Sequence, residues 1–344
     1  DVLRKATATV MLVINKIDTF SHDQLGNEFY ELGFDEMELV SAAHMRGLGE
    51  MMDKAIGFVE WKGGSHIPEE EGVLRISVLG RPNIGKSTLV NQMIGEERQI
   101  VHDAPGTTMD SVDTAFEVDG QQYVLVDTAG VRRRSRISDM VEGFAASRAI
   151  RTIERCHVTL LMIDGTLGPT EQDARLIHLA QERGRALIIL INKWDLVRND
   201  PERNASVLKD EMERKLPHAT WASVIFISAL TGKGVKNILG EVHKAYEQFD
   251  RRLTTAQCNK FLEDAVLAHS PPQKNNRPVR LNYMSQVRVR PPTFTVWCNA
   301  PEGIIRAYHR YLVNRLRDKF GFEGTPIRMK FVEKRRSDPE KWHQ

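Results

Sequence analysis

A glycine-rich stretch at residues 80–88, GRPNIGKST, has the residue types that hold the phosphates of a nucleotide. Its glycines let backbone N–H groups curl around phosphate oxygens, and the positive end of a following helix would point at the same place. The spacing G-x-x-x-x-G-K-[ST] predicts that Lys86 reaches the β- and γ-phosphates and that the Ser87 hydroxyl binds Mg²⁺. The expected phosphate-binding residues are Gly80, Asn83, Ile84, Gly85, Lys86, Ser87 and Thr88.

A second motif, DTAG at residues 127–130, ends the apolar run YVLVDT. Asp127 is placed to hold Mg²⁺ through a water molecule, next to Thr128, and the Gly130 N–H is placed to sense the γ-phosphate. A four-residue match is weak by itself, but it gains weight from its position downstream of the glycine-rich stretch.

The motif NKWD ends another apolar run, ALIILIN. The Asp195 carboxylate can accept two hydrogen bonds from the N1–H and the N2 amine of guanine, a pair that adenine cannot supply. Asn192 and Lys193 would brace the loop and cover the base. Farther along, Ser228 and Ala229 lie in a Ser-Ala-Leu segment that would offer the Ala229 N–H to the guanine O6.

The same Asn-Lys-x-Asp pattern occurs near the start of the sequence, at Asn15, Lys16 and Asp18. Residues 9–59 and 186–246 share one order of features: an apolar strand, Asn-Lys-x-Asp, a helix, a strand ending in Ser-Ala and a second helix. An internal repeat of this kind changes the expected number of domains.

Apolar runs alternate with segments of helical periodicity through most of the chain, which favours βαβ units and an α/β fold with a mostly parallel sheet. Ligands of such sheets bind at the carboxyl ends of the strands, where the motifs lie. Strands are expected at 8–16, 36–42, 73–79, 112–118, 122–127, 157–164, 186–192 and 222–228, and helices at 22–33, 47–59, 86–95, 139–155, 170–183, 201–216 and 234–249.

From about residue 251 the order changes to α-β-β-α-β, which predicts a separate small α+β domain. Its helices are expected at 258–269 and 303–320, and its strands at 279–288, 294–299 and 326–332. Residues 277–344 hold 15 Lys and Arg against 6 Asp and Glu, a local charge of +9 in a chain whose net charge is +2. A basic end beside acidic bulk is typical of contact with nucleic acid, and a solvated charged surface is the alternative.

The 344 residues and 41% hydrophobic content fit a globular protein of two or three domains. Three scattered cysteines exclude a disulfide framework or a cysteine-type metal site and favour a reducing compartment. No apolar run is long enough to cross a bilayer, so no membrane contact is expected. The stretch WKGGSHIPEEEG at 61–72 has no periodicity and three consecutive glutamates, which predicts an acidic linker.

In order along the chain, GRPNIGKST, DAPGTTMD, DTAGV, NKWD and ISAL resemble the motifs of Era-like GTPases, and the earlier NKID and VSAA resemble the back half of another such domain. Tandem P-loop GTPase domains followed by a small basic α+β domain resemble the double Era-like family called Der or EngA, whose C-terminal part is KH-like. The resemblance covers essentially the whole chain. It implies the back half of a first G domain at 1–60, a complete second G domain at 73–250 and a KH-like domain at 251–344.

The resemblance implies a bacterial, cytoplasmic and monomeric enzyme that binds GTP or GDP with Mg²⁺ and hydrolyses GTP in the maturation of the large ribosomal subunit, in contact with rRNA. It places Thr107 and Thr108 in the first switch, where Thr108 would complete the Mg²⁺ shell when GTP is bound. Met109 stands where related motifs usually have Arg. The expected catalytic residues are Lys86, Asn83, Thr108 and Gly130, and the expected Mg²⁺ ligands are Ser87, Thr108 and Asp127.

Val131 follows DTAG, at the place where Ras-type enzymes have a glutamine that orients the attacking water. An apolar side chain cannot do this. The resemblance suggests that a potassium ion helps instead, coordinated in part by Asn83, whereas an asparagine at this place also suits loop geometry alone. Slow intrinsic hydrolysis, as in a molecular switch, is expected.

Basic residues mark two segments that are candidates for RNA contact. One is the expected second switch, VRRRSRIS at 131–138, for which a solvated loop is the alternative. The other is the helix expected at 303–320, where contact through phosphates is favoured over base readout. Its basic residues are Arg306, Arg310, Arg315, Arg317 and Lys319, with Arg280, Arg288 and Arg290 on or beside strands. Alternatively, this domain binds the G domains and exposes its RNA-binding surface only on switching.

The segment GFEG at 321–324 has the spacing of the loop with which KH modules clamp RNA. It follows the long helix directly and precedes a strand. We therefore interpret it as a helix C-terminal turn and not as an RNA clamp.

Other classes of protein fit less well. A circularly permuted GTPase would also place base-reading motifs before the phosphate loop, but the second Asn-Lys-x-Asp motif already completes the domain that starts at Gly80. A P-loop kinase or ATPase conflicts with a guanine-reading Asp195, and a non-catalytic RNA-binding scaffold conflicts with the intact Lys86 and Asp127. We expect one well-formed nucleotide site, and a first G domain whose phosphate loop and switches are missing from this sequence.

Overall fold

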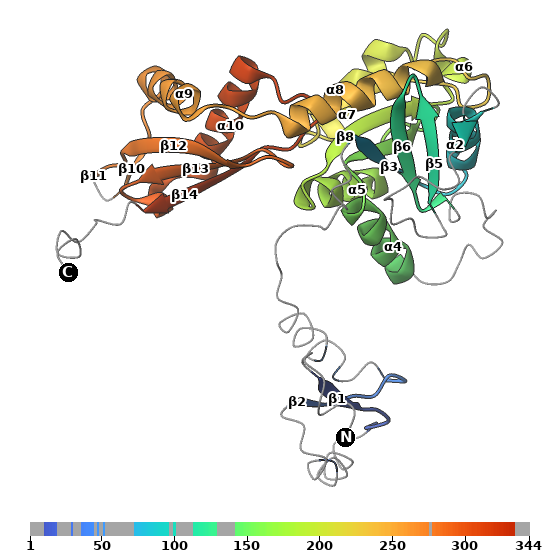
Figure 1. The fold of residues 1–344 in the computed structure, drawn as a ribbon, viewed down its shortest axis with the longest axis horizontal. Helices are drawn as coiled ribbons and strands as arrows, with labels where there is room; N and C mark the ends of the chain where they lie inside the picture. The colour runs from blue at the N-terminus through green and yellow to red at the C-terminus, as the bar shows by residue number, and fades with distance from the viewer. Residues whose placement is uncertain are drawn as a thin grey trace. The chain divides into compact units, whose positions relative to one another are not determined.

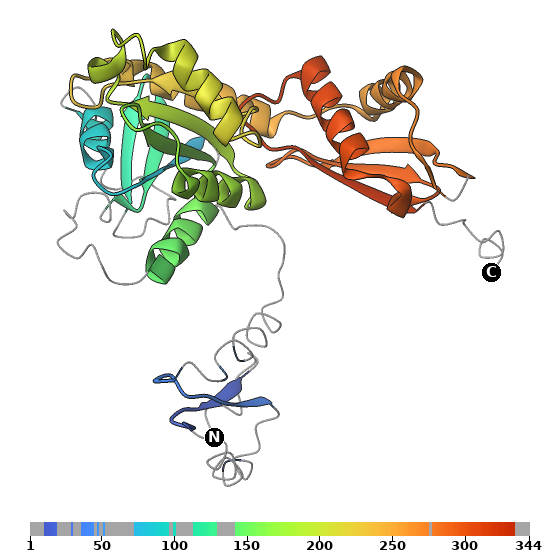
Figure 2. The same cartoon turned by 180° about the vertical axis from the view of Figure 1, so that it is seen from behind.

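In the computed structural model, the described residues are 10–18, 29, 36–44, 47, 51, 72–95, 99–100, 113–128, 142–274 and 277–333. They belong to two compact units, Asp1–Gly64 and Ser65–Gln344 (Figure 1, Figure 2). The helices expected at 22–33 and 47–59 and the linker expected at 61–72 lie almost entirely outside the described residues.

The first unit holds two parallel strands, β1 (Met11–Ile14) and β2 (Glu36–Leu39), within the two segments expected to be strands. Two backbone hydrogen bonds continue the pairing beyond the strands, from Val40 N to Ile14 O at 2.8 Å and from Ile17 N to Val40 O at 3.0 Å. The loop that follows β1 is therefore held against the loop that follows β2.

The second unit contains a seven-stranded sheet in the order β4-β5-β6-β3-β7-β8-β9. Its strands are β3 (Val73–Gly80), β4 (Gln99–Ile100), β5 (Thr114–Val118), β6 (Gln121–Val126), β7 (Val158–Asp164), β8 (Ala186–Asn192) and β9 (Ser223–Phe226). The strands from β6 to β9 in this order are parallel, and β5 and β4 add an antiparallel edge. All residues of β7 and β8 are buried, as expected of parallel strands that are covered on both faces.

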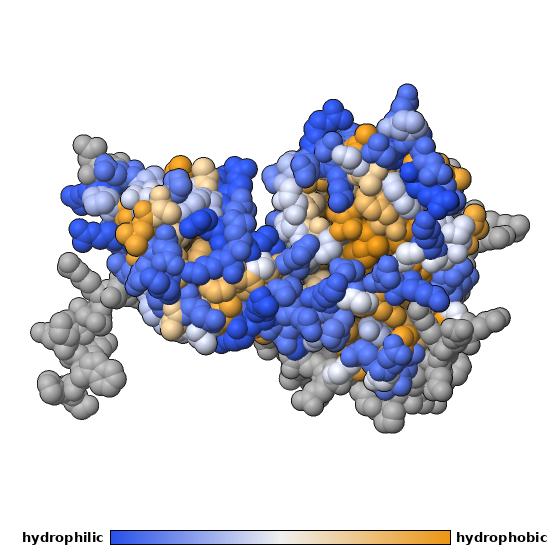
Figure 3. All heavy atoms as spheres, turned by 90° about the horizontal axis from the view of Figure 1, so that it is seen from above, coloured by the Kyte–Doolittle hydropathy of each residue, from blue (hydrophilic) through white to orange (hydrophobic). Residues whose placement is uncertain are grey.

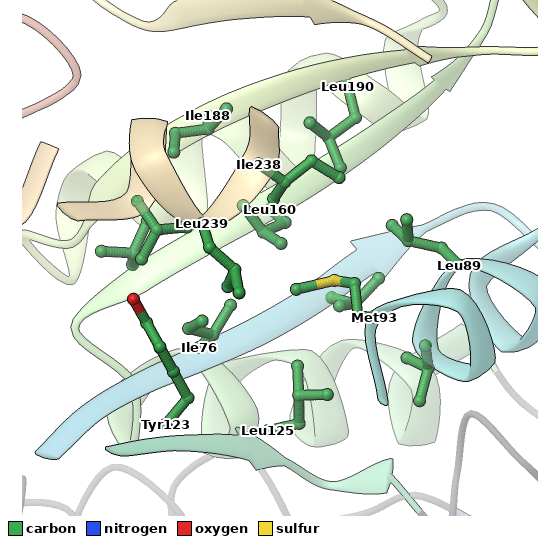
Figure 4. Close-up of a cluster of buried hydrophobic side chains, with 14 of the residues drawn as sticks. Ile76, Leu89, Met93, Tyr123, Leu125, Leu160, Ile188, Leu190, Ile238 and Leu239 are labelled. Atoms are coloured by element: carbon green, nitrogen blue, oxygen red, sulfur yellow. The ribbon is translucent and has the colours of Figure 1, made fainter. Parts of the chain in front are cut away.

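Helices cover both faces of this sheet. The helices are α2 (Lys86–Ile94) and α8 (Ile238–Asp250) on one face, and α4 (Glu142–Glu154), α5 (Glu171–Glu182) and α7 (Ala205–Lys215) on the other. Figure 4 shows Leu89 and Met93 of α2 and Ile238 of α8 in one cluster with the strand residue Leu160. Because neighbouring residues of a strand face opposite sides, Leu161 joins the second cluster, with α4, α5 and α7.

The residues after α8 form the expected α-β-β-α-β order. The elements are α9 (Thr255–Ala268), β12 (Leu281–Arg288), β13 (Thr293–Cys298), α10 (Arg306–Phe320) and β14 (Arg328–Glu333). β13 is the central strand, antiparallel to β12 and parallel to β14. An additional hairpin of β10 (Gln273–Lys274) and β11 (Arg277–Pro278) was not expected from the sequence.

Some helix boundaries differ from the expected ones because cap residues decide them. α7 begins at Ala205 and not at residue 201, since the Asn204 side chain accepts hydrogen bonds from two backbone N–H groups at 3.0 and 3.1 Å. α9 begins three residues before the expected 258, since Thr254 and Gln257 form a capping box.

Backbone hydrogen bonds join the C-terminal elements to the seven-stranded sheet. Leu187 N donates to Gly324 O at 2.8 Å, and Gly324 N donates to Trp221 O at 2.7 Å. Gly324 has a φ of +71°, in the left-handed region that favours glycine. Gly321 caps α10, so the interpretation of GFEG as a helix C-terminal turn is confirmed, and the turn docks on the sheet.

Two arginines among the expected RNA-contacting residues bond to other residues of the chain. Arg317 of α10 donates to the carbonyl oxygens of Phe322 and Thr325, and burial lowers its pKa to about 10. Arg290 pairs with Asp250 at 2.6 Å. The turn after α10 brings its carbonyl oxygens to Arg317, whereas Arg290 meets the carboxylate of Asp250 at the end of α8. The other basic residues of α10 named above, Arg306, Arg310, Arg315 and Lys319, are exposed.

Among the described residues, no helix is both long enough and apolar enough to span a membrane. Seen from above, hydrophilic residues cover much of the visible surface of the second unit, around smaller apolar patches (Figure 3).

Candidate nucleotide-binding site

The motif segments lie along one edge of the seven-stranded sheet. Asp127 follows β6, the 80–88 loop follows β3, Asn192 ends β8 and Ser228 follows β9. Since these strands are parallel and adjacent around β7, their carboxyl ends meet at the same edge, where ligands of such sheets bind. The strand order therefore gathers motifs that are far apart in the sequence.

Two glycines of the 80–88 loop lie where a side chain would collide with a neighbouring strand end. A Cβ on Gly80 would lie 2.8 Å from Met162 O, and a Cβ on Gly85 would lie 2.7 Å from Asn192 Nδ2. Their φ values of +145° and +104° also favour glycine. Asn83 is exposed and has a φ of +60°, in the left-handed region of the backbone. After glycine, asparagine is among the residues that tolerate this conformation best.

Lys86 begins α2, and its side chain folds back over the loop. The Nζ donates to Gly80 O at 2.8 Å and to Arg81 O at 2.6 Å. An ammonium has three N–H donors, so one donor remains for a phosphate oxygen. Burial lowers the pKa of Lys86 to about 8, so the group is still mainly charged at neutral pH.

Asn192 ties the base-reading loop to the phosphate loop. The side chain is only 3% exposed. Its Nδ2 donates to Ile84 O at 2.7 Å, and its Oδ1 accepts from Ala229 N at 2.9 Å. One amide thus connects the loops after β3, β8 and β9. The Ala229 N–H, which was expected to serve the guanine O6, is already engaged by Asn192, so O6 would share this donor.

Lys193 is held by an aspartate that no motif indicated. Lys193 has a φ of +63°, and its Nζ lies 2.6 Å from Asp164 Oδ2. Burial of Asp164 opposes ionisation, but hydrogen bonds from Lys193 and Thr166 outweigh it and lower the pKa of the Asp164 carboxyl. The Gly165 N–H donates to Asn192 O at 2.8 Å. The loop after β7 therefore fixes the base-reading loop from the side.

The segment after β7 also reaches the phosphate loop. Arg81 Nε lies 3.6 Å from Asp173 Oδ1, and Asp173 is fully buried. The other oxygen of Asp173 accepts from Thr170 N at 2.9 Å and from Thr170 Oγ1 at 2.7 Å, which caps α5. Sequence reasoning missed Asp164 and Asp173, because only the fold brings their carboxylates to the lysine and arginine of the motifs.

Asp195 lies in the first turn of the short helix α6 (Trp194–Val197) and is partly exposed. In the part of the chain that the structure describes, its carboxylate has no hydrogen-bond partner, so both oxygens are available to guanine. Ser228 is buried, and its Oγ accepts from Thr231 N at 3.2 Å. Ser228 therefore shapes its loop from the inside.

The Asp127 carboxylate is engaged by α4. Arg148 Nε and Nη2 donate to its two oxygens at 2.7 Å each, and Thr152 Oγ1 donates at 3.2 Å. The hydrogen bond to Asp127 raises the pKa of Arg148. A Mg²⁺-bound water would compete with this bidentate guanidinium for the same oxygens. Thr128 is buried, and its hydroxyl lies 2.9 Å from that of Thr114, so it braces β5.

The residues near the phosphate loop fit Mg²⁺ by their chemistry. Ser87 and Asp127 offer hydroxyl and carboxylate oxygens, and Mg²⁺ takes few such protein ligands beside water and phosphate oxygens. Among the described residues, no group of three His, Cys, Asp or Glu side chains is placed to hold a metal ion. Thr107, Thr108, Met109, Gly130 and the basic segment 131–138 lie outside the described residues.

The first unit contains a second loop of the base-reading kind. Asn15 Oδ1 accepts from Lys16 N at 2.8 Å and from Ala42 N at 3.0 Å. Asp18 Oδ1 accepts from Ser41 Oγ at 2.6 Å. Lys16 is left-handed, with a φ of +72°. The structure thus brings Asn15, Lys16 and Asp18 into one loop, in which all three side chains are exposed.

Comparison with known protein families matches two parts of the chain. A family described as the KH-domain-like C-terminal part of EngA bacterial GTPase enzymes matches residues 252–331. A family described as 50S ribosome-binding GTPase matches residues 75–193. The first match covers α9 to β14, and the second covers the sheet from β3 to the end of β8.

Curated relatives match nearly the whole chain. GTPase Der of Caldanaerobacter subterraneus is 43% identical over 336 residues, which cover 95% of this chain and 74% of the relative. GTPase Der of Moorella thermoacetica is 44% identical over 329 residues, which cover 96% and 74%. Among solved structures, Era in complex with MgGDPNP and nucleotides 1506–1542 of 16S ribosomal RNA is similar at 23% identity and a TM-score of 0.39, over 77% of this chain and 93% of that chain. The expected fold class and enzyme class, a P-loop GTPase with a C-terminal KH-like domain, are confirmed by the family and relative matches, and the chain belongs to the GTPase Der family.

Proposed function

We propose that this chain is a cytoplasmic, monomeric GTP-dependent switch that acts in the maturation of the large ribosomal subunit and contacts rRNA. The observation that carries the proposal is the buried Asn192, whose amide holds the phosphate loop, the base-reading loop and the Ser-Ala loop together. The description of the family that matches residues 75–193, a 50S ribosome-binding GTPase, supports the ribosomal partner. The exposed basic residues of α10 support contact with RNA phosphates.

In this proposal, residues 73–250 form a complete G domain and residues 251–344 form the KH-like domain. Residues 1–60 belong to another G domain, and residues 61–72 link the two. Compact units divided at Gly64 and a family match to residues 252–331 support this division.

Guanine would be selected by the Asp195 carboxylate, which accepts from N1–H and the N2 amine. Asn192 and Lys193 would keep the loop in place, with Asp164 as the counterion of Lys193. An adenine in the same place would leave the carboxylate facing groups that cannot donate in this pattern, and this unpaired carboxylate disfavours ATP.

Hydrolysis of GTP needs positioning and charge stabilisation more than covalent chemistry. With two N–H donors held by Gly80 O and Arg81 O, Lys86 would offer its third to the β- and γ-phosphates. Ser87, Asp127 and Thr108 would hold Mg²⁺, which neutralises charge on the phosphates when it is bound. The Gly130 N–H would bind the γ-phosphate, and Asp127 would release Arg148 when it takes up a metal-bound water. Nucleotide loading would thereby be coupled to α4.

We also propose that potassium assists hydrolysis, because Val131 cannot orient water as a glutamine does. Asn83 is exposed on the phosphate loop and would supply part of the coordination. Omitting potassium, with sodium at the same ionic strength, should slow hydrolysis severalfold, and an Asn83→Ala variant should lose the difference. Equal rates in both salts would refute the role of potassium without touching the GTPase activity.

The proposed function is tested by co-sedimentation with isolated large and small ribosomal subunits in the presence of a non-hydrolysable GTP analogue, GDP or no nucleotide. Large-subunit binding that depends on the nucleotide and weakens with salt is expected. Binding that is independent of both the nucleotide and the salt concentration, or that is tighter to small subunits, would contradict the proposal. Competition of GTP hydrolysis by ATP provides the test of base selection.

A further inference from the structure

Arg148 of α4 bonds to the carboxylate that is expected to face Mg²⁺. Its Nε donates to Asp127 Oδ2 and its Nη2 donates to Asp127 Oδ1, both at 2.7 Å. Two parallel bonds between a guanidinium and a carboxylate are among the strongest that side chains form. To help hold Mg²⁺, Asp127 would have to accept from a metal-bound water through one of the same oxygens. Two cations beside one carboxylate also repel each other, so Arg148 and the metal compete for Asp127.

The position of Asp127 is fixed by its backbone. Asp127 N donates to Asp113 Oδ1 at 2.9 Å, and Asp113 Oδ2 accepts from Arg155 Nη2 at 2.6 Å. The side chain of Asp113 is fully buried, and Arg155 directly follows α4. A second ion pair, separate from that of Arg148, therefore holds the backbone at Asp127 in place. The carboxylate should stay where it is, whichever cation it binds.

Arg148, in contrast, is placed so that it can leave. Its side chain is 55% exposed, whereas that of Asp127 is 18% exposed. A long cationic side chain at the surface can turn into water at little cost, because water solvates its charge well. Thr152 Oγ1, which donates to Asp127 Oδ2 at 3.2 Å, also lies 2.9 Å from Arg148 O. The hydroxyl of Thr152 thus keeps a partner within α4 when Asp127 binds a metal-bound water.

The burial of Asp127 decides what happens when the metal leaves. A carboxylate with little access to water is destabilised when it loses a cation, unless another cation takes its place. Arg148 takes this place, so it lowers the free energy that is needed to remove Mg²⁺ from the site. Because Mg²⁺ neutralises charge on the nucleotide phosphates, a chain that loses the metal more easily also holds GDP less firmly.

We propose that Arg148 is a positioning residue that competes with Mg²⁺ for Asp127, lowers the Mg²⁺ affinity of the GDP-bound chain and thereby speeds the release of GDP. This inference rests on the proposed function as a GTP-dependent switch and names a regulation of the same site. A switch must lose GDP before it binds GTP again. The guanidinium on α4 supplies part of this step from within the chain.

The test uses the full chain loaded with a fluorescent N-methylanthraniloyl derivative of GDP. Titration with Mg²⁺ at constant ionic strength gives the Mg²⁺ affinity, and a chase with unlabelled GDP gives the release rate. Arg148→Ala should bind Mg²⁺ about three- to fivefold more tightly than the unchanged chain, the range expected for loss of a well-aligned surface ion pair. At the Mg²⁺ concentration that half-saturates the unchanged chain, the variant should release GDP about two- to threefold more slowly, since less of it is metal-free.

Two further variants show whether the bond to Asp127 is the cause. Arg148→Lys keeps the charge but loses the bidentate geometry, so its Mg²⁺ affinity should lie between those of the unchanged chain and Arg148→Ala. It also decides the question if the alanine variant does not fold. Arg151→Ala is the matched control, because Arg151 is an exposed cation of the same helix. Its Mg²⁺ affinity should stay close to that of the unchanged chain.

A gain of Mg²⁺ affinity is informative because damage to the fold would weaken metal binding. The proposal is overturned if Arg148→Ala and Arg148→Lys bind Mg²⁺ no more tightly than the unchanged chain. It is also overturned if Arg151→Ala gains as much affinity as Arg148→Ala, since the gain would then follow net charge alone. Failure to sediment with large subunits would refute the proposed function, whereas the Mg²⁺ titration needs no ribosome and still decides the role of Arg148.

Discussion

The loops at residues 15–18 and 192–195 can be compared bond by bond. In each, the asparagine Oδ1 accepts from an alanine N–H, from Ala42 at 3.0 Å and from Ala229 at 2.9 Å. In each, the lysine is left-handed, and the residue after it donates its N–H to the neighbouring strand end at 3.0 Å. In each, the serine Oγ of the Ser-Ala segment accepts from a backbone N–H three residues later at 3.2 Å.

The surroundings of the two loops differ. Asn192 is buried and donates to Ile84 O of the phosphate loop, whereas Asn15 is exposed and, among the described residues, its bonds stay within its own loop and the Ser-Ala segment. Lys193 has Asp164 as a counterion. Asp18 accepts from the Ser41 hydroxyl, while Asp195 offers both oxygens to the surroundings.

This difference separates two tasks of the motif. Local sequence, an apolar parallel strand followed by Asn-Lys-x-Asp and a Ser-Ala segment, is sufficient to shape the loop. In the second loop, contacts with the phosphate loop and with the loop after β7 also bury the asparagine. Hydrogen bonds and charge interactions are stronger in a buried site than in water. The loop at 192–195 should therefore carry the nucleotide affinity of this chain, and matched substitutions in the two loops should differ in their effect.

The largest difference is expected between Asp195→Asn and Asp18→Asn. An amide in place of the Asp195 carboxylate turns an N–H group toward the two donors of guanine, so the affinity for GTP should fall at least about a hundredfold. Asp18→Asn should leave the affinity and the stoichiometry nearly unchanged, as measured by isothermal titration calorimetry. Xanthosine triphosphate, which has an oxygen in place of the N2 amine, should bind the Asp195→Asn variant and thereby show that it is folded. Equal losses in the two variants would mean that both loops bind nucleotide.

A second pair of variants, Asn192→Ala and Asn15→Ala, tests the connection to the phosphate loop. Removal of the Asn192 amide leaves Ile84 O and Ala229 N–H unpaired in a buried place, which should lower the free energy of unfolding by about 2–4 kcal/mol. Asn15→Ala should cost less than about 1 kcal/mol, because water replaces an exposed amide. Urea unfolding measures both, and GTP affinity should fall only with Asn192→Ala. A similar cost in both loops would show that the tie to Ile84 adds nothing.

The third variant, Asp164→Asn, asks whether the loop after β7 supports base binding. Without its counterion, Lys193 loses the bond that fixes its side chain, so affinities for GTP, GDP and guanosine should each fall by about three- to tenfold. Asp210→Asn, an exposed carboxylate of α7, is the control for a change of one charge. A loss confined to the nucleotides, with guanosine unaffected, would assign Asp164 to phosphate binding instead.

Much of the site could be predicted because short stretches of sequence determine its strands and loops. The apolar run ALIILIN defines β8 to the residue, and the glycine spacing marks the phosphate loop, since both depend on neighbours in the sequence. Contacts across the fold could not be predicted in this way. Asp164, Asp173 and Arg148 belong to segments without a motif, and their partners become clear only once strand order is known.

The same limit applies to the basic residues of the C-terminal part. Arg317 counts as a cation of a surface that binds nucleic acid, but the turn after α10 supplies carbonyl oxygens that bind its guanidinium, and Arg290 pairs with Asp250. Counting cations in the sequence does not distinguish those that face water from those that bond to carbonyl oxygens.

The smallest expected effect is the pH dependence of GTP affinity. Lys86 lies beside the loop at 192–195, so this dependence should come from the second unit and not from the loop at 15–18. Burial lowers the pKa of Lys86 to about 8, and bound phosphates should raise it again, so GTP binding favours the protonated lysine. Affinity should therefore be highest below pH 8 and fall as pH rises through 8, by about fourfold between pH 7 and pH 8.5. Titration with GTP across this range measures the slope. Lys86→Arg should bind more weakly and lose the part of the slope that comes from Lys86, because its guanidinium stays charged. Any titration of guanine itself is common to both proteins and cancels when their slopes are compared. A slope that persists in Lys86→Arg would assign the titration to another group, and a slope that disappears with Asp18→Asn would place phosphate binding in the first unit.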